Sequence, residues 1–365
     1  EIDMCNGSIM DKLISFALPL MLSGMLQLMF NAVDIVVVGR FSGSQSLAAV
    51  GATTALIYLF TNLFIGISLG ANVLAARYYA AGKHEEMSET VHTAMMFALI
   101  SGIIMIFVGL FFSRLALEIM GTPSDVIDQA TLYMRIYFMG MPFFMLYNYG
   151  AAILRAVGDT KRPLIFLIIS GVVNACLNML LVIVFHLDVA GVAIATVTSQ
   201  FISCVLVIGC LYRTKSSYQL RFSRLKIRKE YLKPICQVGI PAGIQSTVIN
   251  FSNALLQSSV NSFGSTTMAG YTAANNIFGF LYVSVNAITQ ACMSFTSQNY
   301  GLRKLKRMDK ILIDCLILTV VVSLVLGGGV YLFGAEILRL YTEEVEVIRC
   351  GIEIFAYTTV TYFLC

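Results

Sequence analysis

Residues 14–38 read "ISFALPLMLSGMLQLMFNAVDIVVV" and contain a single charged residue, Asp34. A run of about 20 apolar residues is long enough for an α-helix to cross the hydrocarbon core of a bilayer. The backbone must be helical there because hydrocarbon offers no partners for free N–H and C=O groups. This stretch therefore predicts a membrane-spanning helix that carries one carboxylate.

The composition of the whole chain agrees with that reading. Of the 365 residues, 58% are hydrophobic and 12% are charged, whereas soluble domains have about 45–50% apolar and about 25% charged residues. We therefore expect an all-α polytopic membrane protein. The predicted spans lie near residues 14–38, 48–76, 92–112, 131–154, 163–185, 190–212, 235–261, 268–297, 311–333 and 351–365.

The basic residues predict how the chain is oriented in the membrane. If the spans alternate in direction, most of the 24 Lys and Arg residues fall on one side. They are Lys12, Arg77, Lys83, Arg155, Lys161 and Arg162, with two clusters at 213–233 and 303–310. The positive-inside rule places this side, and the N-terminus, in the cytoplasm. We expect a multi-pass protein of the plasma membrane, with no nucleic-acid partner.

Two parts of the chain share one layout. The segment "FALPLML" (16–22) corresponds to "VGIPAGI" (238–244), and "RFSGSQSLAAVGA" (40–52) corresponds to "NSFGSTTMAGYTA" (261–273). This repeat predicts an N-terminal lobe at 1–212, a basic cytoplasmic linker at 213–234 and an incomplete C-terminal lobe at 235–365. We expect that a few residues are missing before Glu1 and one or more helices after Cys365. Parallel repeats of this kind place a cavity between two lobes, as in alternating-access transporters.

Polar residues recur at helical spacing inside several spans. Ser23, Gln27, Asn31 and Asp34 are spaced four, four and three residues apart, which places them on one helix face. Such side chains either join membrane helices by hydrogen bonds or line a hydrated cavity, and the sequence leaves both readings open. The candidate cavity-lining residues are Gln27, Asn31, Asn253, Gln257 and Asn286.

Asp34 calls for a more specific explanation. An aspartate at the centre of a spanning helix costs roughly 2.5–3.5 kcal/mol on insertion scales. It could pair with a basic residue for structural reasons, or lie at the outer interface near Arg40. However, no Lys or Arg lies deep in a predicted span. We therefore favour a third reading, in which Asp34 faces a hydrated cavity and exchanges a proton or a hard monovalent cation.

Metal and enzyme motifs are missing from the sequence. There is no CxxC pair, no HExxH motif, and no metal-ligand spacing among the three histidines. A membrane-embedded enzyme would require two intramembrane acids or a buried nucleophile and base. We expect a protein that is not an enzyme and has no cofactor beyond a coupling ion.

Several motifs resemble the multidrug and toxic compound extrusion (MATE) transporters. They are the Asp34 stretch, "ILRAVGDTKRP" (153–163), "NACLN" (174–178) and "VAGVAIAT" (189–196). The resemblance implies a fold of twelve helices in two six-helix lobes, with the C-terminal end missing from this chain. It also implies export of cationic, amphipathic drugs or toxins in exchange for protons or sodium ions. We expect such a small-molecule substrate, a lipid bilayer as surroundings, and a monomer.

The resemblance also implies a cation site in the N-terminal lobe. Asp34 matches the family's acidic residue of the first helix, and Pro19 matches the proline where that helix can bend. The other matching positions are Asn174, Thr196 and Tyr133. Asn178 departs from the many relatives that have an aspartate there, so the site holds one formal negative charge. A sodium ion, if bound, would use Asp34, Asn174, Asn178 and Thr196.

A flippase for lipid-linked saccharides has the same general architecture and is the alternative function. Such a protein is expected to line its cavity with basic residues that bind the pyrophosphate group. This chain shows no basic residue at depth, so we favour the exporter.

Overall fold

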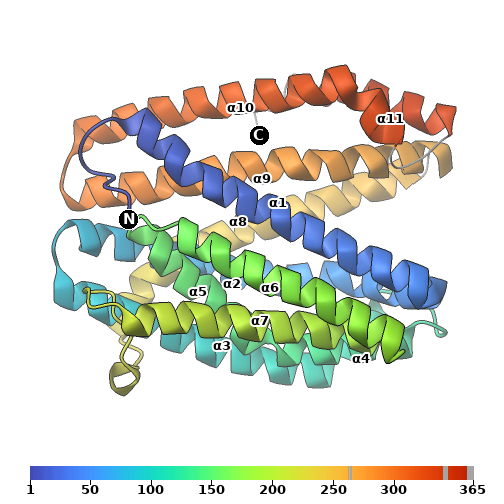
Figure 1. Ribbon diagram of the computed structural model, residues 1–365, viewed down its shortest axis with the longest axis horizontal. Helices are drawn as coiled ribbons and strands as arrows, with labels where there is room; N and C mark the ends of the chain where they lie inside the picture. Colours follow the sequence, from blue (N-terminus) through green and yellow to red (C-terminus); the bar gives the residue numbers. More distant parts are fainter. Residues whose placement is uncertain (262, 264, 340–343, 360–365) are drawn as a thin grey trace.

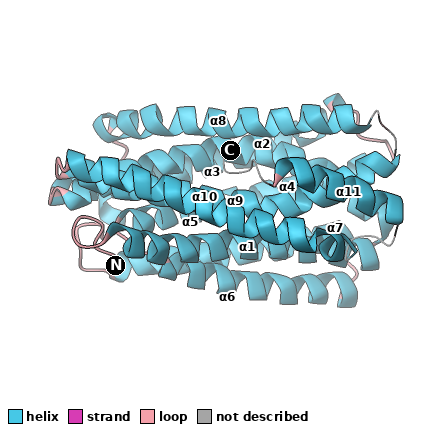
Figure 2. Ribbon diagram, turned by 90° about the horizontal axis from the view of Figure 1, so that it is seen from above, coloured by secondary structure: helices cyan, strands magenta, loops and turns pink. Residues whose placement is uncertain are grey.

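The computed structural model describes residues 1–261, 263, 265–339 and 344–359. Every regular element in this part of the chain is a helix, and the long helices run side by side in one elongated bundle (Figures 1 and 2). The elements are α1 (Ile9–Phe41), α2 (Gly43–Ala80), α3 (His84–Ile119), α4 (Ile127–Met139), α5 (Met141–Ala156), α6 (Lys161–Asn178), η1 (Met179–Val184), α7 (Asp188–Arg213), η2 (Phe222–Arg224), α8 (Lys229–Asn261), α9 (Ser265–Gly301), α10 (Leu305–Arg339) and α11 (Val345–Thr358).

The prediction of an all-helical, multi-span membrane protein is confirmed. Within the described residues, 7 helices are long and apolar enough to cross a membrane. Each predicted span falls on a helix or on two consecutive helices. The last one, 351–365, coincides with the end of α11, and its residues 360–365 lie outside the described part.

The fourth predicted span differs from the structure, because it is divided into α4 and α5 at Gly140. Pro142 is the second residue of α5 and has no N–H to donate, so the backbone ladder of α4 cannot continue through it. The break packs tightly against α3, since a Cβ atom on Gly102 would lie 2.4 Å from the Cα atom of Pro142.

Helix lengths support the internal repeat. Helices α1 and α8 each have 33 residues and contain Pro19 and Pro241, respectively. The next helix of each half is also similar in length, with 38 residues in α2 and 37 in α9. The third helices, α3 and α10, have 36 and 35 residues. The two halves therefore begin with the same three-helix unit. The boundaries predicted at 212 and 234 remain predictions from the sequence.

The two halves interlock through α1 and α8, which cross between them (Figure 1). The first part of α1 packs on α9, where the rings of Phe16 and Phe295 lie 5.6 Å apart, edge to face. The last part of α1, including Val37 and Val38, belongs instead to the large core formed with α2 to α7. Ile235, near the start of α8, belongs to that same core. We call the end where the N-terminus lies the basic end, and the opposite end the distal end.

Glycines bring α2 and α8 into backbone contact from the middle of the two helices toward the basic end. A Cβ atom on Gly70 would lie 2.0 Å from the carbonyl oxygen of Ile235, and one on Gly243 would lie 2.7 Å from that of Leu63. Small residues commonly allow this close approach between membrane helices. The basic end is therefore closed between α2 and α8 by main-chain packing.

Buried amides add to this closure from the other side of α2. Asn72 donates from Nδ2 to the carbonyl of Ala152 at 2.8 Å, and Ser294 donates to Asn72 Oδ1 at 3.1 Å. Gln298 donates from Nε2 to the carbonyl of Ala156 at 2.7 Å. These bonds join α2, α5 and α9, and therefore connect the two halves of the repeat.

Residues 1–8, the N-terminal segment, lie across the same closed end. The Ile2 N–H donates to the carbonyl of Gly158 at 3.0 Å. Gly158 has φ +91°, and a Cβ atom there would lie 2.5 Å from the Ile2 carbonyl oxygen, so only glycine fits. On the other half, Asn299 donates to the Met4 carbonyl at 3.1 Å and Lys304 to the Cys5 carbonyl at 2.8 Å. We call these contacts, with those of Asn72 and Gln298, the basic-end seal.

We expect Gly70→Ala to destabilise the protein by about 1–3 kcal/mol, because the added methyl group forces α2 away from α8. The measurement is the temperature at which helical circular dichroism is lost in detergent. Gly51→Ala is the matched control on the same helix, since no atom lies within 4 Å of its added Cβ. Alanine favours helix over glycine by about 1 kcal/mol, so the control should melt at the same or a higher temperature. Equal melting of both variants would contradict the close α2–α8 contact.

Candidate cation-exchange site

Asp34 lies on the distal half of α1, where α1 packs against α6. The helix pair is close, because a Cβ atom on Gly171 of α6 would lie 1.9 Å from Phe30 Cε2. Asp34 precedes the end of α1 by seven residues, which is about 10 Å of helix. The half-buried carboxylate is directed toward α6 by a hydrogen bond from Asn178.

Two predicted site residues on α6, Asn174 and Asn178, form a hydrogen-bonded cluster with Asp34. Asn178 donates from Nδ2 both to Asp34 Oδ1 and to Asn174 Oδ1, the second bond being 3.2 Å long. The side chains of both asparagines are almost fully enclosed, since Asn178 is 0% and Asn174 5% exposed. Their spacing of four residues places them on one face of α6. The structure therefore brings together Asp34, Asn174 and Asn178.

One oxygen atom in this cluster has no partner. Asn178 Oδ1 is buried and accepts no hydrogen bond from the described residues. A buried acceptor without a partner is unfavourable by about 1–3 kcal/mol. Asn178 is also the last α-helical residue before the π-helical turn η1, and such turns are frequent at functional sites. The free oxygen fits a ligand for a cation that is held next to the carboxylate of Asp34.

In the part of the chain that the structure describes, no basic side chain forms an ion pair with Asp34. Among the described residues, the ion pairs are formed by other acids, and Asp34 has none within 4.0 Å. The described residues therefore do not support the alternative in which Asp34 forms a structural ion pair with Lys or Arg. In a low-dielectric environment an unpaired carboxylate favours taking up a positive charge.

Tyr133 and Thr196 have different relations to Asp34. Tyr133 of α4 is buried, lies within electrostatic range of Asp34, and stacks on Tyr137 with centroids 6.2 Å apart. Tyr137 is also within range of Asp34 and was not predicted from the sequence, although it follows Tyr133 by one helical turn. The Thr196 hydroxyl donates within its own helix to the Val192 carbonyl at 3.0 Å. It has no hydrogen bond with Asp34 among the described contacts.

Pro19 lies inside α1, which runs without interruption from Ile9 to Phe41. Ser23 donates to the Pro19 carbonyl at 2.8 Å. Proline provides no N–H for the carbonyl four residues earlier, so the helix is weakest just before it. Pro19 also separates the part of α1 that packs on α9 from the part that carries Asp34. A bend at Pro19 remains a prediction.

The candidate cavity-lining residues are polar and exposed within apolar helices. Gln27 and Asn31 lie on α1, Asn253 on α8 and Asn286 on α9, and all four are exposed. The side chain of Gln257 is outside the described part of the structure. Amide groups facing lipid chains would lose their hydrogen bonds to water, so exposed amides favour a hydrated surface. Their role as cavity lining remains a prediction.

The described residues contain no group of three or more His, Cys, Asp or Glu that could hold a metal ion. Any cation at the site would instead be held by the single carboxylate of Asp34 and by neutral oxygens. This donor set fits a proton or a weakly held monovalent cation better than a divalent metal, which usually takes more charged ligands.

Comparisons with known proteins agree with this architecture. The sequence model of the MatE family matches residues 19–180 and 241–365. The chain is 30% identical to the probable multidrug resistance protein YoeA of Bacillus subtilis (strain 168), over 96% of this chain and 77% of that protein. It is 21% identical to the multidrug export protein MepA of Staphylococcus aureus (strain NCTC 8325 / PS 47), over 98% of this chain and 79% of that protein.

Solved structures show the same fold. A multidrug resistance MATE family transporter in an outward-facing conformation matches with a TM-score of 0.93 and 21% identity, over 100% of this chain and 81% of that one. A transporter from Pyrococcus furiosus Vc1 (DSM3638), described as having a binding pocket of reverse polarity, matches with a TM-score of 0.91 and 22% identity, over 100% and 81%. The helical bundle, its repeat and the match to the family sequence lead to one conclusion: the chain belongs to the MATE (MatE) family of multidrug transporters.

Proposed function

We propose that this protein exports cationic, amphipathic compounds across the plasma membrane in exchange for protons or sodium ions, with Asp34 as the group that both ions and cargo compete for. The observation that carries the proposal is the carboxylate of Asp34, which has no ion pair in the described part of the chain and is bonded to the amide of Asn178. Placing a charged side chain within an apolar spanning helix is energetically unfavourable, and ionisable residues found there in general have a function.

The first step is that Asp34 can hold one positive species at a time. An ionised carboxylate attracts a cationic substrate, whereas a proton or sodium ion bound to it cancels that attraction. The cluster provides a single formal negative charge, because Asn174 and Asn178 are neutral. Simultaneous binding of ion and cargo is therefore unfavourable, and this competition couples the two fluxes.

The second step is access for water and cargo. Gln27 and Asn31 precede Asp34 on α1 and are exposed. The flexible side chains of Met25 and Met29 lie beside them and can adapt to substrates of different shapes. This face of α1 therefore offers polar groups near the carboxylate and apolar surface for the rest of an amphipathic molecule.

The third step is alternation between two states. The basic-end seal holds the halves together at the end predicted to face the cytoplasm, while Asp34 lies toward the distal end. This arrangement corresponds to a state open to the outside. In the opposite state the bonds of Asn72 and Gln298 across the halves would have to break, and α1 would bend at Pro19.

The saccharide flippase remains the alternative function. A transporter of this fold carries a pocket described as having reverse polarity and a suggested different function, so the fold alone does not select the cargo. Within five residues of Asp34, the exposed side chains on α1 are those of Met29, Asn31, Ala32, Ile35 and Val36. None of them is basic, so this part of α1 offers no cationic group to a pyrophosphate.

We expect Asp34→Asn to reduce coupled efflux at least about tenfold, because an amide does not take up a proton near neutral pH and has no negative charge to attract a cation. The measurement is efflux of a fluorescent cation, such as ethidium, from proteoliposomes under an imposed pH or sodium gradient. Asp128→Asn is the matched control, since it makes the same change in an exposed ion pair with Arg114 and should retain efflux. Efflux at the wild-type rate in Asp34→Asn would overturn the proposal.

We expect Asn178→Asp to shift the coupling preference toward sodium, because it places a second carboxylate beside Asp34. The measurement is the ratio of sodium-driven to pH-driven efflux, which should rise several-fold over that of the native chain. Sodium binding can also be followed in the purified variant as an increase in melting temperature with sodium concentration. A variant that melts independently of sodium and keeps the native ratio would show that Asn178 is not at the ion site.

We expect Asn72→Ala to open the basic end, because it removes the bonds to Ala152 and Ser294. The readout is the labelling of Cys5, which is buried in the basic-end seal and whose thiol pKa is raised by burial. With Cys5 as the sole cysteine, a membrane-impermeant thiol reagent should label the variant several times faster than the parent chain. Gln129→Ala, at the distal end, is the control. Equal rates in all three proteins would contradict the role of the seal.

A further inference from the structure

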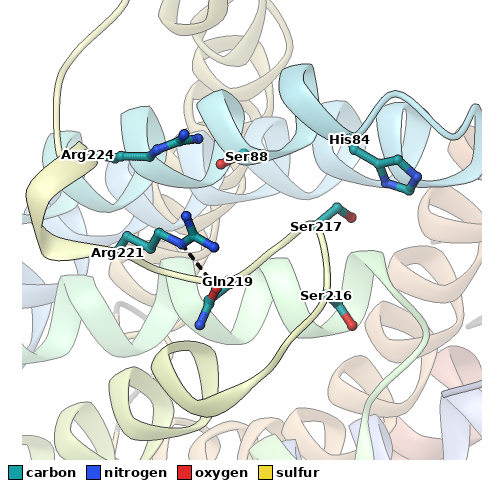
Figure 3. A pocket seen from close by; sticks show the side chains of 7 residues that line it. All are labelled: His84, Ser88, Ser216, Ser217, Gln219, Arg221 and Arg224. Atoms are coloured by element: carbon teal, nitrogen blue, oxygen red, sulfur yellow. Dashed lines mark hydrogen bonds between the residues drawn. The ribbon is translucent and has the colours of Figure 1, made fainter.

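A small pocket lies at the basic end, between the beginning of α3 and the linker that connects α7 to α8 (Figure 3). Its volume is about 120 Å³. His84 and Ser88 on α3 form one wall, and the linker forms the other. The linker residues that line it are Ser216, Ser217, Gln219, Arg221 and Arg224.

The linker wall is held in place by hydrogen bonds. The Arg221 backbone N–H donates to His92 Nε2 at 3.0 Å, and His92 Nδ1 in turn lies 2.6 Å from the Ser88 carbonyl. Because Nε2 accepts, Nδ1 carries the proton and donates. Leu220 N–H donates to the Leu211 carbonyl at 3.0 Å. These hydrogen bonds therefore hold the linker, and with it its basic residues, in a defined position against α3 and α7.

The ionisable groups that line the pocket are all basic. Arg221 and Arg224 have no carboxylate within ion-pair distance among the described residues, and Arg221 Nε instead donates to Gln219 Oε1 at 3.1 Å. Of the three acids in the first turns of α3, Glu85 is exposed and has no ion pair among the described residues, whereas the other two are paired with cations. Glu86 lies 3.3 Å from Lys83, and Glu89 lies 2.6 Å from Arg228.

Phosphate is the anion that this set of donors fits. Planar guanidinium groups donate two parallel hydrogen bonds to phosphate oxygens, and serine hydroxyls and the glutamine amide supply further donors. Basic pockets beside the membrane-facing ends of spanning helices commonly bind the headgroups of anionic lipids. The pocket lies directly beyond the end of α7 at Arg213 and before the apolar part of α3.

An aromatic pair next to the pocket favours a phospholipid over free phosphate as the source of that anion. The rings of Tyr212 and Phe222 are stacked, with centroids 5.6 Å apart and an interplanar angle of 30°. Both residues are more than half exposed, at 52% and 58%. Exposed aromatic side chains at the end of a spanning helix are typical of the membrane interface. Phe222 directly follows Arg221, so an exposed ring and a guanidinium group of the pocket are adjacent in the chain.

We propose that this pocket is a binding site for a phosphate group, taken from an anionic phospholipid of the leaflet at the basic end or from free phosphate. Arg221 and Arg224 bind the phosphate oxygens, Ser88 and Ser217 donate hydroxyl groups, and Tyr212 and Phe222 lie against the lipid chains. The site is separate from Asp34, which lies on the distal half of α1.

The test uses the purified full chain and counts bound lipids by native mass spectrometry. The probes are short-chain phosphatidylglycerol, short-chain phosphatidylcholine and inorganic phosphate. We expect phosphatidylglycerol to bind with at least tenfold higher affinity than phosphatidylcholine, and Arg221→Gln with Arg224→Gln to abolish that preference. The matched control is Lys229→Gln with Lys233→Gln, which also removes two basic charges at this end of the molecule, from the beginning of α8, outside the pocket lining. It should retain affinity within about twofold.

Ser217→Asp provides a second test, because it leaves both arginines in place and adds a negative charge inside the pocket. It should lower phosphatidylglycerol affinity about as strongly as the double arginine variant. Inorganic phosphate gives a further readout. If it binds saturably to the native chain and to the double lysine variant but not to the double arginine variant, the site is supported and free phosphate is identified as a source. The proposal is overturned if neither phosphatidylglycerol nor inorganic phosphate binds. It is also overturned if both double variants lose affinity equally, since surface charge alone would then explain binding.

Discussion

Hydrocarbon offers no hydrogen bonds, and this constraint governs most of the structure. It requires helical backbone throughout the apolar runs, and it makes every polar side chain within them unfavourable unless a partner or water is present. The carboxylate of Asp34 is the clearest case, because its hydrogen bond comes from a neutral amide and not from a cation. The asparagine that provides this bond keeps a buried oxygen without a partner, so the cluster is not satisfied by the described residues alone.

The same constraint explains how the two halves are joined. Apolar helices gain little from contact with each other in a membrane, since lipid chains are equally apolar, and close packing and hydrogen bonds must hold them together. Gly243 at the middle of the helices and Gly70 nearer the basic end provide the packing, and Asn72 and Gln298 provide hydrogen bonds to main-chain carbonyls. A seal built from a few such bonds can break and re-form, which is what an alternating transporter requires.

Charge outside the membrane has a different role. The basic linker contributes to the predicted orientation, and two of its arginines, Arg221 and Arg224, line a pocket without an ion pair to any described carboxylate. The relatives named as multidrug proteins and the transporter with a pocket of reverse polarity share this fold. This agrees with the general rule that function is decided by side chains at particular sites and not by the fold.

The sequence by itself determined the class of the fold, because the length and hydropathy of each span, the charge asymmetry and the repeat are local or compositional properties. It also singled out Asp34, since one acid in a run such as 14–38 is visible without any structure. Only the tertiary structure decided which groups meet that acid. Asn174 and Asn178 approach it because α1 and α6 pack at Gly171, whereas Thr196 bonds within its own helix. The division at Gly140, the partnerless oxygen of Asn178 and the seal across the N-terminal segment depend on contacts between residues far apart in the chain, which helical periodicity does not encode.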